Sequence, residues 1–296
     1  SLRDTLAAAF GKTTRPLNVN FFAHPAPGMT GPSADRWQKH LSPYFQEHGI
    51  EQPAGVSAGP FQPFDTARCA VLEQYTPAVV SFHFGLPPAD LVTRIKRTGA
   101  RIISTATTVA EAKWLADKGC DAIIAQGYEA GGHRGMFLTG DIDTQMGTLA
   151  LVPQIADAVD IPVIAAGGIA DERGIVAALA LGASAVQVGT AFLFTAEATV
   201  NSLYRETLQN AGTQTTALTN VFSGRPTRCT VNRVMLEQGP MASDAPAFPM
   251  GFAAMAPLRA AAEAEGNRDF SAHHCGQAAA LGREVWSGSW PTGPAT

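Results

Sequence analysis

The stretch that decides the fold is Cys120–Gly135, which reads CDAIIAQGYEAGGHRG. Its first part, up to Ile124, is short and apolar, which is typical of a buried strand. The turn that follows has glycines at positions 131, 132 and 135, and glycine lets backbone N–H groups approach an anion or a flat ring closely. His133 is the side chain of this turn that can exchange a proton near neutral pH. The stretch therefore predicts a ligand site at the end of a strand, with a tight turn and a solvated histidine as the alternative.

Short apolar runs recur along the chain and alternate with amphipathic segments. The runs lie at 16–22, 78–84, 101–106, 122–126, 162–166 and 185–189. Most are apolar on both faces, as strands of a parallel sheet covered by helices must be. Helices are expected at 88–98, 109–118 and 171–181, each followed by the glycine that commonly ends a helix. The alternation predicts a wound α/β fold.

The number of these units indicates an incomplete barrel. We find six strand–helix units, whereas a closed TIM (β/α)8 barrel has eight. Residues 2–10 predict an amphipathic helix with no strand before it. We therefore predict an α/β fold of the TIM (β/α)8 type that lacks its first two strands in this sequence, with a segment of about 50 residues absent at the front. An open sheet is the alternative.

Two parts of the chain depart from this alternation. Residues 24–76 are rich in proline and glycine, with a short helical piece at 37–45, and long loops at strand ends are often functional. Further along come a helix at 196–208, a less regular region and an alanine-rich helix at 256–265. We expect three parts: the barrel at 1–194, a small helical cap at 195–270, and a C-terminal segment at 271–296 that packs back on the barrel.

The composition is that of a globular protein with a large core. Of 296 residues, 46% are hydrophobic and 16% are charged, and the net charge is −4. No basic run favours nucleic acid or an anionic membrane surface, and no apolar stretch reaches the roughly 18 residues that span a bilayer. The four cysteines form no Cys-x-x-Cys pair, and the adjacent His273, His274 and Cys275 lack the spacing of metal ligands. We predict a cytoplasmic protein with no metal, nucleic-acid or membrane partner.

Glycines follow two consecutive predicted strands. Gly167 and Gly168 come directly after the strand at 162–166, and Gly189 with Thr190 ends the next strand. Neighbouring parallel strands that end in glycine before a helix form the usual phosphate site of such barrels, because N–H groups and a helix N-terminus point at the anion. Thr190 adds a hydroxyl donor. The alternative is that these are ordinary glycines on the approach to a helix.

Polar side chains at other strand ends extend this candidate site. Asn20 and Gln126 carry carboxamides, which offer a donor and an acceptor to the N–C=O edge of a flavin or a nucleobase. Gln187 lies within an apolar strand, where an unpaired polar group is costly, so we expect it to face the barrel lumen. Tyr204, on the helix after the last strand, either reaches the site from the cap or only packs. Further candidates are His24 and His83 near strand ends, and Glu129 and Arg134, which flank His133 and can orient it or pair with each other.

Several segments together resemble one enzyme family. They are Ala125–Gly135 (AQGYEAGGHRG), Ala165–Ile169 (AAGGI), Gln187–Thr190 (QVGT) and Ser223–Arg233 (SGRPTRCTVNR). With these motifs the chain resembles the nitronate monooxygenases, FMN enzymes formerly called 2-nitropropane dioxygenases, over nearly its whole length. The resemblance implies a TIM barrel with a small helical substrate domain. The family's first strand, which holds a Gln-Ala-Pro-Met-type segment against the flavin, has no counterpart here.

The resemblance also implies roles for single residues. The catalytic histidine of the family falls on His133, which then also contacts the substrate. A tyrosine that lines the family's substrate cavity is similar to Tyr204. Flavin contacts fall on Asn20, Gln126, Gly131, Gly168, Gln187, Val188, Gly189 and Thr190, with Gly132 and Gly167 adjoining.

The reaction that the resemblance implies is the FMN-dependent oxidation of alkyl nitronates, such as propionate 3-nitronate, by O2 to a carbonyl compound and nitrite. Such an enzyme serves nitroalkane detoxification. The oligomeric state stays open, and a homodimer is one of the assemblies that the sequence allows. One alternative is an NAD(P)H-dependent FMN enoyl-thioester reductase of the related barrels, which share the Gly-Gly-His motif. The other is a catalytically silent barrel, or a fragment, that binds a phosphate ligand.

Overall fold

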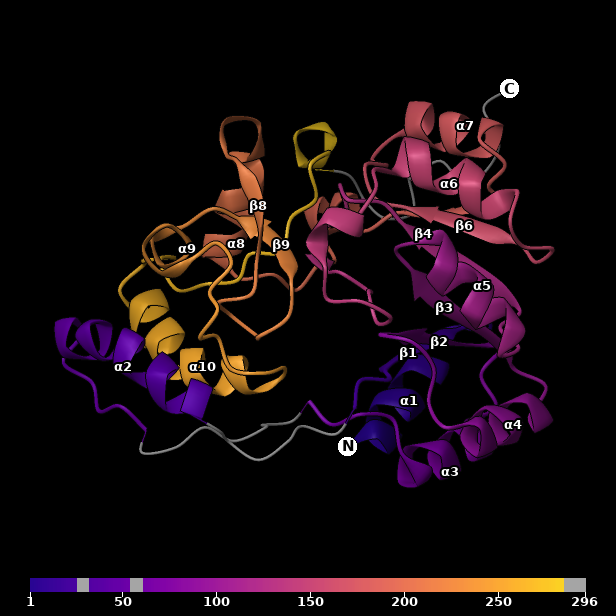
Figure 1. Cartoon of the computed structure of the whole chain (residues 1–296), viewed down its shortest axis with the longest axis horizontal. Coiled ribbons are helices and arrows are strands. Elements are labelled where there is room, and N and C mark those ends of the chain that lie inside the picture. The colour runs from indigo at the N-terminus through magenta and orange to yellow at the C-terminus, as the bar shows by residue number, and fades with distance from the viewer. Residues whose placement is uncertain (26–31, 54–60, 285–296) are drawn as a thin grey trace.

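The larger of two sheets is parallel and curled. The computed structural model describes residues 1–25, 32–53 and 61–284. Six strands run in the order β1-β2-β3-β4-β6-β7. They are β1 (Asn18–Phe22), β2 (Val79–His83), β3 (Arg101–Ala106), β4 (Ala122–Gln126), β6 (Val163–Ala166) and β7 (Ala185–Gln187). The predicted barrel-type α/β architecture is confirmed, and the sheet is consistent with part of a TIM barrel (Figure 1).

Helices cover the outer side of this sheet (Figure 1). They are α1 (Leu2–Phe10), α3 (Thr66–Tyr75), α4 (Ala89–Arg97), α5 (Val109–Asp117), α6 (Thr148–Ala156) and α7 (Glu172–Ala180). The side chains of Thr108 and Asp171 accept N–H bonds at the starts of α5 and α7. Gly119 and Gly182 follow the same two helices with positive φ, a conformation that ends a helix and favours glycine. Within the described ranges, no helix is both long and apolar enough to cross a membrane.

The main core lies between the sheet and these helices. Phe82, Ile102 and Ile123 of the strands are fully buried and pack in one cluster with Leu115 and Leu151 of the helices. Burying each such side chain contributes about 1.5–3 kcal/mol. This packing holds the carboxyl ends of the strands at one edge of the sheet, and the glycine-rich turns lie at that edge.

The predicted helical cap also contains a second sheet. Strands β8 (Thr216–Thr219) and β9 (Thr227–Thr230) pair antiparallel, and β9 pairs with β5 (Gly132–His133). Because β5 belongs to the turn after β4, the cap is hydrogen-bonded to the turn that carries His133. The remaining helices are α8 (Ser202–Gln209), α9 (Arg233–Gln238), α10 (Met250–Ala264) and the short 3-10 helices η1 (Ile142–Thr144), η2 (Thr190–Phe194), η3 (Ala211–Thr213) and η4 (Ala279–Leu281).

Helix α2 (Pro32–Glu47) adds an early part of the chain to the cap. It lies in the segment that the sequence predicts as a long loop of the barrel, yet Trp37 packs in one buried cluster with Leu258 and Phe270. Figure 1 shows α2 beside α10, away from the parallel sheet. An amphipathic helix buries its apolar face against whichever surface complements it, and residue spacing does not say which surface that is. The boundary of the cap at residue 194 stays a prediction.

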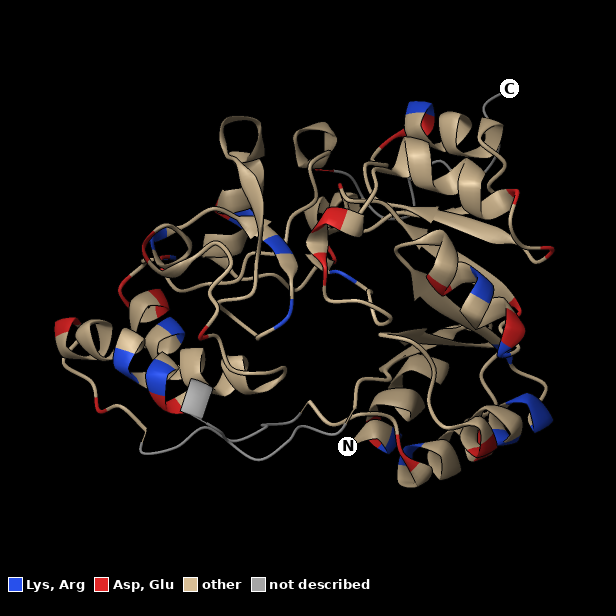
Figure 2. Ribbon diagram, in the orientation of Figure 1, with Lys and Arg blue, Asp and Glu red and all other residues tan. Residues whose placement is uncertain are grey.

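Charged residues lie mainly on the outer helices, with basic and acidic residues interspersed (Figure 2). Two bidentate pairs link neighbouring helices. Arg94 of α4 donates to Glu73 of α3 at 2.8 and 2.7 Å, and Arg233 of α9 donates to Glu47 of α2 at 2.7 and 2.9 Å. Pairs at this level of exposure contribute about 0–1 kcal/mol each, so burial rather than charge holds the helices in place.

Candidate functional site

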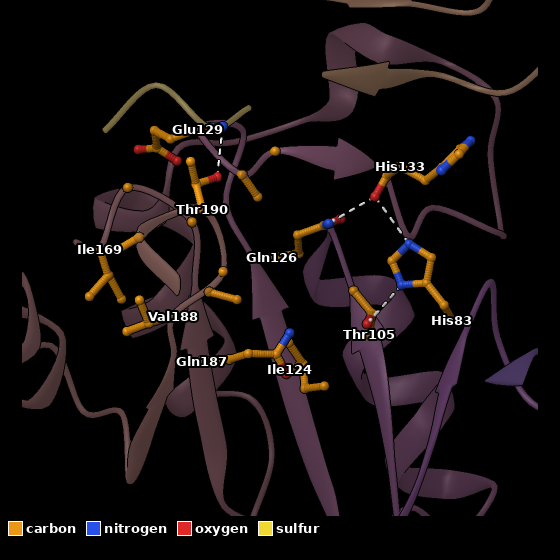
Figure 3. Close-up of a pocket in the computed structure, with 18 of the residues that line it drawn as sticks. His83, Thr105, Ile124, Gln126, Glu129, His133, Ile169, Gln187, Val188 and Thr190 are labelled. Atoms are coloured by element: carbon orange, nitrogen blue, oxygen red, sulfur yellow. Dashed lines mark hydrogen bonds between the residues drawn. The ribbon is translucent and has the colours of Figure 1, made fainter. Parts of the chain in front are cut away.

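A cavity of about 530 Å³ opens at the carboxyl ends of the parallel strands. Its lining includes most of the predicted cofactor residues: Asn20, Gln126, Gly131, Gly167, Gly168, Gln187, Val188, Gly189 and Thr190. His133 is on its wall, and Figure 3 shows the imidazole directed away from Ile124 and Gln187. Two predicted site residues, Gly132 and Tyr204, are not among the described residues that line the cavity. The fold thus gathers residues from distant loops at the edge where parallel barrels bind ligands.

The side chain of Gln126 holds the turn that carries His133. Its Nε2 donates to the carbonyl oxygen of His133 (2.9 Å), and its Oε1 accepts from the N–H of Gly135 (2.7 Å). His83 donates from Nε2 to the same carbonyl (3.0 Å), since a carbonyl can only accept, and its Nδ1 lies 3.1 Å from the hydroxyl of Thr105 (Figure 3). Both amide atoms of Gln126 are therefore engaged within the protein, and its contact with a flavin stays a prediction.

The segment around Gly276 closes one side of the cavity. The N–H of Gly276 donates to Oγ1 of Thr190 (3.0 Å), and the N–H of Gln277 donates to the carbonyl of Glu129 (2.9 Å). A Cβ on Gly131 would stand 2.6 Å from the nitrogen of Gly276, so this approach requires glycine. Because Thr190 accepts here, its own hydroxyl proton remains available to an anion.

The glycines after β6 and β7 leave the backbone open to the cavity. Gly167 and Gly168 have φ of 106° and 72° in the left-handed region, and they precede α7. A Cβ on Gly189 would meet nothing within 4 Å in the described structure. Thr190 begins η2, a short 3-10 helix, and the α-helix expected at 196–208 is α8, which begins only at Ser202. The predicted pair of glycine loops is present, but only the first leads into an α-helix.

Glu129 and Arg134 form a hydrogen bond neither with the imidazole of His133 nor with each other, so neither of the two alternatives that the sequence left open is found. The carboxylate of Glu129 accepts from the N–H and the hydroxyl of Thr148 (both 2.9 Å), at the start of α6. The guanidinium of Arg134 is buried and donates to the two carbonyl oxygens of residues 126–127 at 2.8 and 2.7 Å. Burial lowers the pKa of Arg134 to about 10, so it stays charged. Glu129 therefore holds the start of α6, and Arg134 holds the backbone at residues 126–127.

His133 lies uncharged in a wall of aromatic rings. Its Nε2 is 2.8 Å from the hydroxyl of Ser223. Burial, followed by the charges of His274, His83 and Arg225, holds the pKa of His133 well below its usual value. The neutral imidazole can accept a proton or donate one N–H bond. The ring centroid lies 5.5–6.5 Å from those of Phe22, Phe84, Phe248, Phe252 and His274.

Sequence reasoning missed most of these neighbours. Ser223 is marked in the sequence only as the first residue of a family motif, and nothing local marks Phe248 or His274. Phe84 adopts φ of 72°, which is uncommon for a residue other than glycine and points to a constrained position at the end of β2. That strain is visible only in the structure, so the sequence held no signal for it.

Tyr204 points into the chain at residues 273–274 rather than into the cavity. Its hydroxyl donates to the carbonyl of His274. Its ring stacks on that of His273, with centroids 4.5 Å apart and planes at 4°. Tyr204 therefore holds the segment whose Gly276 meets Thr190. Its contact with substrate stays a prediction.

The buried histidines predict a loss of stability in acid. Burial is the main cause that lowers the pKa values of His83, His273 and His274 to about 4. An unfolded histidine titrates near 6.5, so between pH 6.5 and 4 the unfolded chain binds more protons than the folded one. Stability is therefore complete above pH 6.5 and is lost as the pH falls toward 4.

We expect the urea midpoint to fall steadily over this window, and to fall less steeply in His83→Gln. Glutamine keeps a donor for the carbonyl of His133 but does not titrate. Urea unfolding at half-unit pH steps measures both slopes. Identical slopes in the two proteins would show that His83 does not carry the pH dependence.

The curled parallel sheet, with a glycine-lined cavity and a histidine at its carboxyl edge, is the arrangement of TIM-barrel enzymes. Residues 1–287 match the family model for nitronate monooxygenase, and the chain belongs to this family.

The chain is also similar to individual proteins and solved structures. The chain is 45% identical to a nitronate monooxygenase of Pseudomonas aeruginosa over 279 residues, which are 93% of this chain and 79% of the relative. It is 37% identical to the solved structure of a nitroalkane oxidase from Streptomyces ansochromogenes, with a TM-score of 0.86 over 96% of this chain and 81% of that one. The structure of FabK from Thermotoga maritima is 28% identical, with a TM-score of 0.65 over 96% of this chain and 76% of that one.

Proposed function

We propose that this chain oxidises alkyl nitronates with O2, using FMN, to a carbonyl compound and nitrite. The observation that carries the proposal is the position of His133, an uncharged imidazole on the wall of a glycine-lined cavity. Gln126 fixes its backbone and Ser223 contacts its ring. Family membership supports the type of reaction.

The cavity fits FMN in size and in the chemistry of its lining. Its volume of about 530 Å³ falls within the roughly 300–1,000 Å³ of small-ligand sites. The backbone of Gly167 and Gly168 and the hydroxyl of Thr190 would hold the phosphate, and Asn20 and Gln187 would bind the ring. No described side chain fills the space that Gly189 leaves, so a ligand can use it. FMN, when bound, supplies the redox chemistry.

The direction in which the hydroxyl of Ser223 donates determines which ring nitrogen of His133 carries the proton. Its Oγ accepts the N–H of Arg225 (3.3 Å) and lies 3.2 Å from the carbonyl oxygen of Arg225 and 2.8 Å from Nε2 of His133. If the hydroxyl donates to Arg225, Nε2 carries the proton and Nδ1 is free to take the α-proton of a nitroalkane. If it donates to His133, Nδ1 carries the proton and can donate to a nitronate oxygen. Ser223 and His133 together can therefore act on the neutral nitroalkane and on its nitronate anion.

The decisive experiment is an aerobic assay of the FMN-loaded protein with propionate 3-nitronate. We expect O2 uptake with release of nitrite, and slow oxidation of NADH in a parallel reaction. Rapid anaerobic bleaching of the flavin by NADH, without nitrite formation from nitronate, would instead identify a reductase. A protein that takes up no flavin even when FMN is added would contradict the cofactor assignment.

Gly189→Ala tests the cofactor site without disturbing the fold. Its φ is not in the left-handed region and a Cβ there meets no described protein atom, so we expect an unchanged melting temperature in the flavin-free protein. The methyl group projects into space assigned to FMN, and we expect the Kd for FMN to rise at least about tenfold, roughly the cost of a misfitted methyl group. Fluorescence titration with FMN measures the Kd.

Gly140→Ala is the matched control, because Gly140 is equally open and lies outside the cavity lining. It should bind FMN like the wild type. An unchanged Kd in Gly189→Ala would mean that FMN does not occupy the loop after β7.

A further inference from the structure

Two arginines near the His133 turn, Arg134 and Arg228, donate their hydrogen bonds to other parts of the protein. Arg134 donates from all three of its nitrogens, two of them to the carbonyls of residues 126–127. Arg228 donates from Nε and Nη2 to the carbonyl of Tyr128 (3.1 and 2.9 Å) and from Nη1 to Thr216. Both side chains are buried. In both side chains, all three guanidinium nitrogens therefore donate within the protein.

Arg225 differs from these two. Its Nη1 donates to the carbonyl of Met136 (3.1 Å), while Nε and Nη2 have no acceptor among the described residues. It forms none of the ion pairs of the described chain. The carboxylate whose charge acts on it, that of Glu111, is already held by the N–H groups of Thr107 (2.7 Å) and Phe137 (2.6 Å). A guanidinium has five N–H donors, so most of those of Arg225 have no acceptor within the part of the chain that the structure describes.

Arg225 shares an aromatic wall with His133. Its Cζ lies 4.3 Å from the centroid of Phe84 and 6.0 Å from that of Phe248. The imidazole of His133 lies 6.0 and 5.5 Å from the same two rings. Stacking on an aromatic face holds the plane of a guanidinium without using its N–H groups. The donors of Arg225 therefore stay available next to His133.

His24 provides a second, independent observation at this wall. It is only 3% exposed, the backbone of Phe61 and the charge of Arg225 act on its imidazole, and neither ring nitrogen is bonded to a described side chain. Its ring lies 4.9 Å from Phe248 and 6.4 Å from Phe84. Burying an unpaired polar group costs about 1–3 kcal/mol, and the backbone of Phe61 can serve only one of the two ring nitrogens, so the other nitrogen is free to meet a ligand.

We propose that Arg225 and His24 form an anion subsite that binds an oxyanion of the substrate beside His133. The inference rests on the proposed function, because it names the group that would hold a nitronate substrate. The planar fork of a guanidinium matches two coplanar oxygens, which are present in a nitronate and in a carboxylate. An uncharged His133 cannot balance a negative substrate, and Arg225 can.

The test compares Arg225→Gln with wild type on two substrates that share the nitronate group. Propyl-1-nitronate has no other anionic group, and propionate 3-nitronate has a carboxylate as well. We expect kcat/KM to fall at least about tenfold, mainly through KM. A loss on both substrates identifies the nitronate as the bound group, and a loss on propionate 3-nitronate alone identifies the carboxylate. Activity within twofold of wild type on both substrates would overturn the subsite.

Two further variants keep the test valid if Arg225→Gln folds poorly. Arg225→Lys keeps the charge but not the fork, and we expect it to retain more activity than Arg225→Gln. His24→Phe keeps the ring packing and removes both nitrogens, and we expect a several-fold rise in KM at normal FMN content. Arg101→Gln, at an arginine with 75% side-chain exposure, is the control that should behave like wild type.

Binding of propionate separates this proposal from the proposed function. Calorimetry on the FMN-loaded protein measures the Kd of this unreactive carboxylate. If wild type oxidises no nitronate but binds propionate through Arg225, the proposed function fails and the subsite stands. If nitronates are oxidised and Arg225→Gln changes neither their kinetics nor the Kd of propionate, the subsite fails and the function stands.

Discussion

His133→Asn is expected to lower kcat/KM for alkyl nitronates about a hundredfold, a usual contribution of a positioned acid–base group. Asparagine is too short to replace the contact of Nε2 with Ser223, but it leaves the backbone carbonyl of residue 133 to Gln126 and His83. The variant therefore loses the titratable nitrogen without losing the bonds that hold the turn. Nitrite release and O2 uptake by the FMN-loaded proteins measure the effect.

His40→Asn is the matched control for this substitution. His40 lies on α2, 3.2 Å from Asp244, with 46% of its side chain exposed. It should leave kcat/KM unchanged. A His133→Asn protein with normal FMN content and wild-type kcat/KM would remove His133 from the reaction.

The strands and helices of the barrel were predictable because their signals are local. The run at 101–106 coincides with β3, and the helix expected at 109–118 is α5 at Val109–Asp117. Both depend on apolar spacing and on a terminal glycine, which neighbouring residues already display. Helix α6 was missed because Pro153 lies inside it and interrupts the helical pattern.

The cap was harder to predict because its signals are not local. Strands β8 and β9 are short and rich in threonine, and β9 pairs not only with β8 but also with β5, which lies about 95 positions earlier in the chain. The neighbours of His133 were not predictable for the same reason, because they are distant from it in sequence. Ser223 and Phe248 contact it from the cap, and no residue pattern within the Gly-Gly-His turn predicts either contact.

The arginines show where sequence reasoning reaches its limit. Arg134, next to His133, is the natural candidate for binding an anion, yet its three guanidinium nitrogens all donate to Gln145 and to backbone carbonyls. Arg225, distant in sequence, keeps free donors at the same wall. The acceptors that separate the two are carbonyl groups, which every residue carries, so the residue types along the chain cannot tell a structural arginine from a free one.

Arg134→Met is expected to lower the free energy of unfolding by about 4 kcal/mol. The substitution removes donors from the carbonyls of residues 126–127 and from Gln145, and each buried acceptor left unpaired costs about 1–3 kcal/mol. Lysine should rescue little, because one ammonium cannot reach acceptors that three separate guanidinium nitrogens serve. Urea unfolding at pH 7 measures the difference.

Arg101→Met is the control for this loss of stability. The side chain of Arg101 is 75% exposed and 3.4 Å from Asp121, and such surface changes usually stay within about 0.5 kcal/mol. Equal stability of the two variants would mean that the turn after β4 does not depend on Arg134. A large loss in Arg134→Met alone would show that the carbonyls at the end of β4 need this buried cation. The position of His133 then depends on a residue whose three guanidinium nitrogens all donate within the protein.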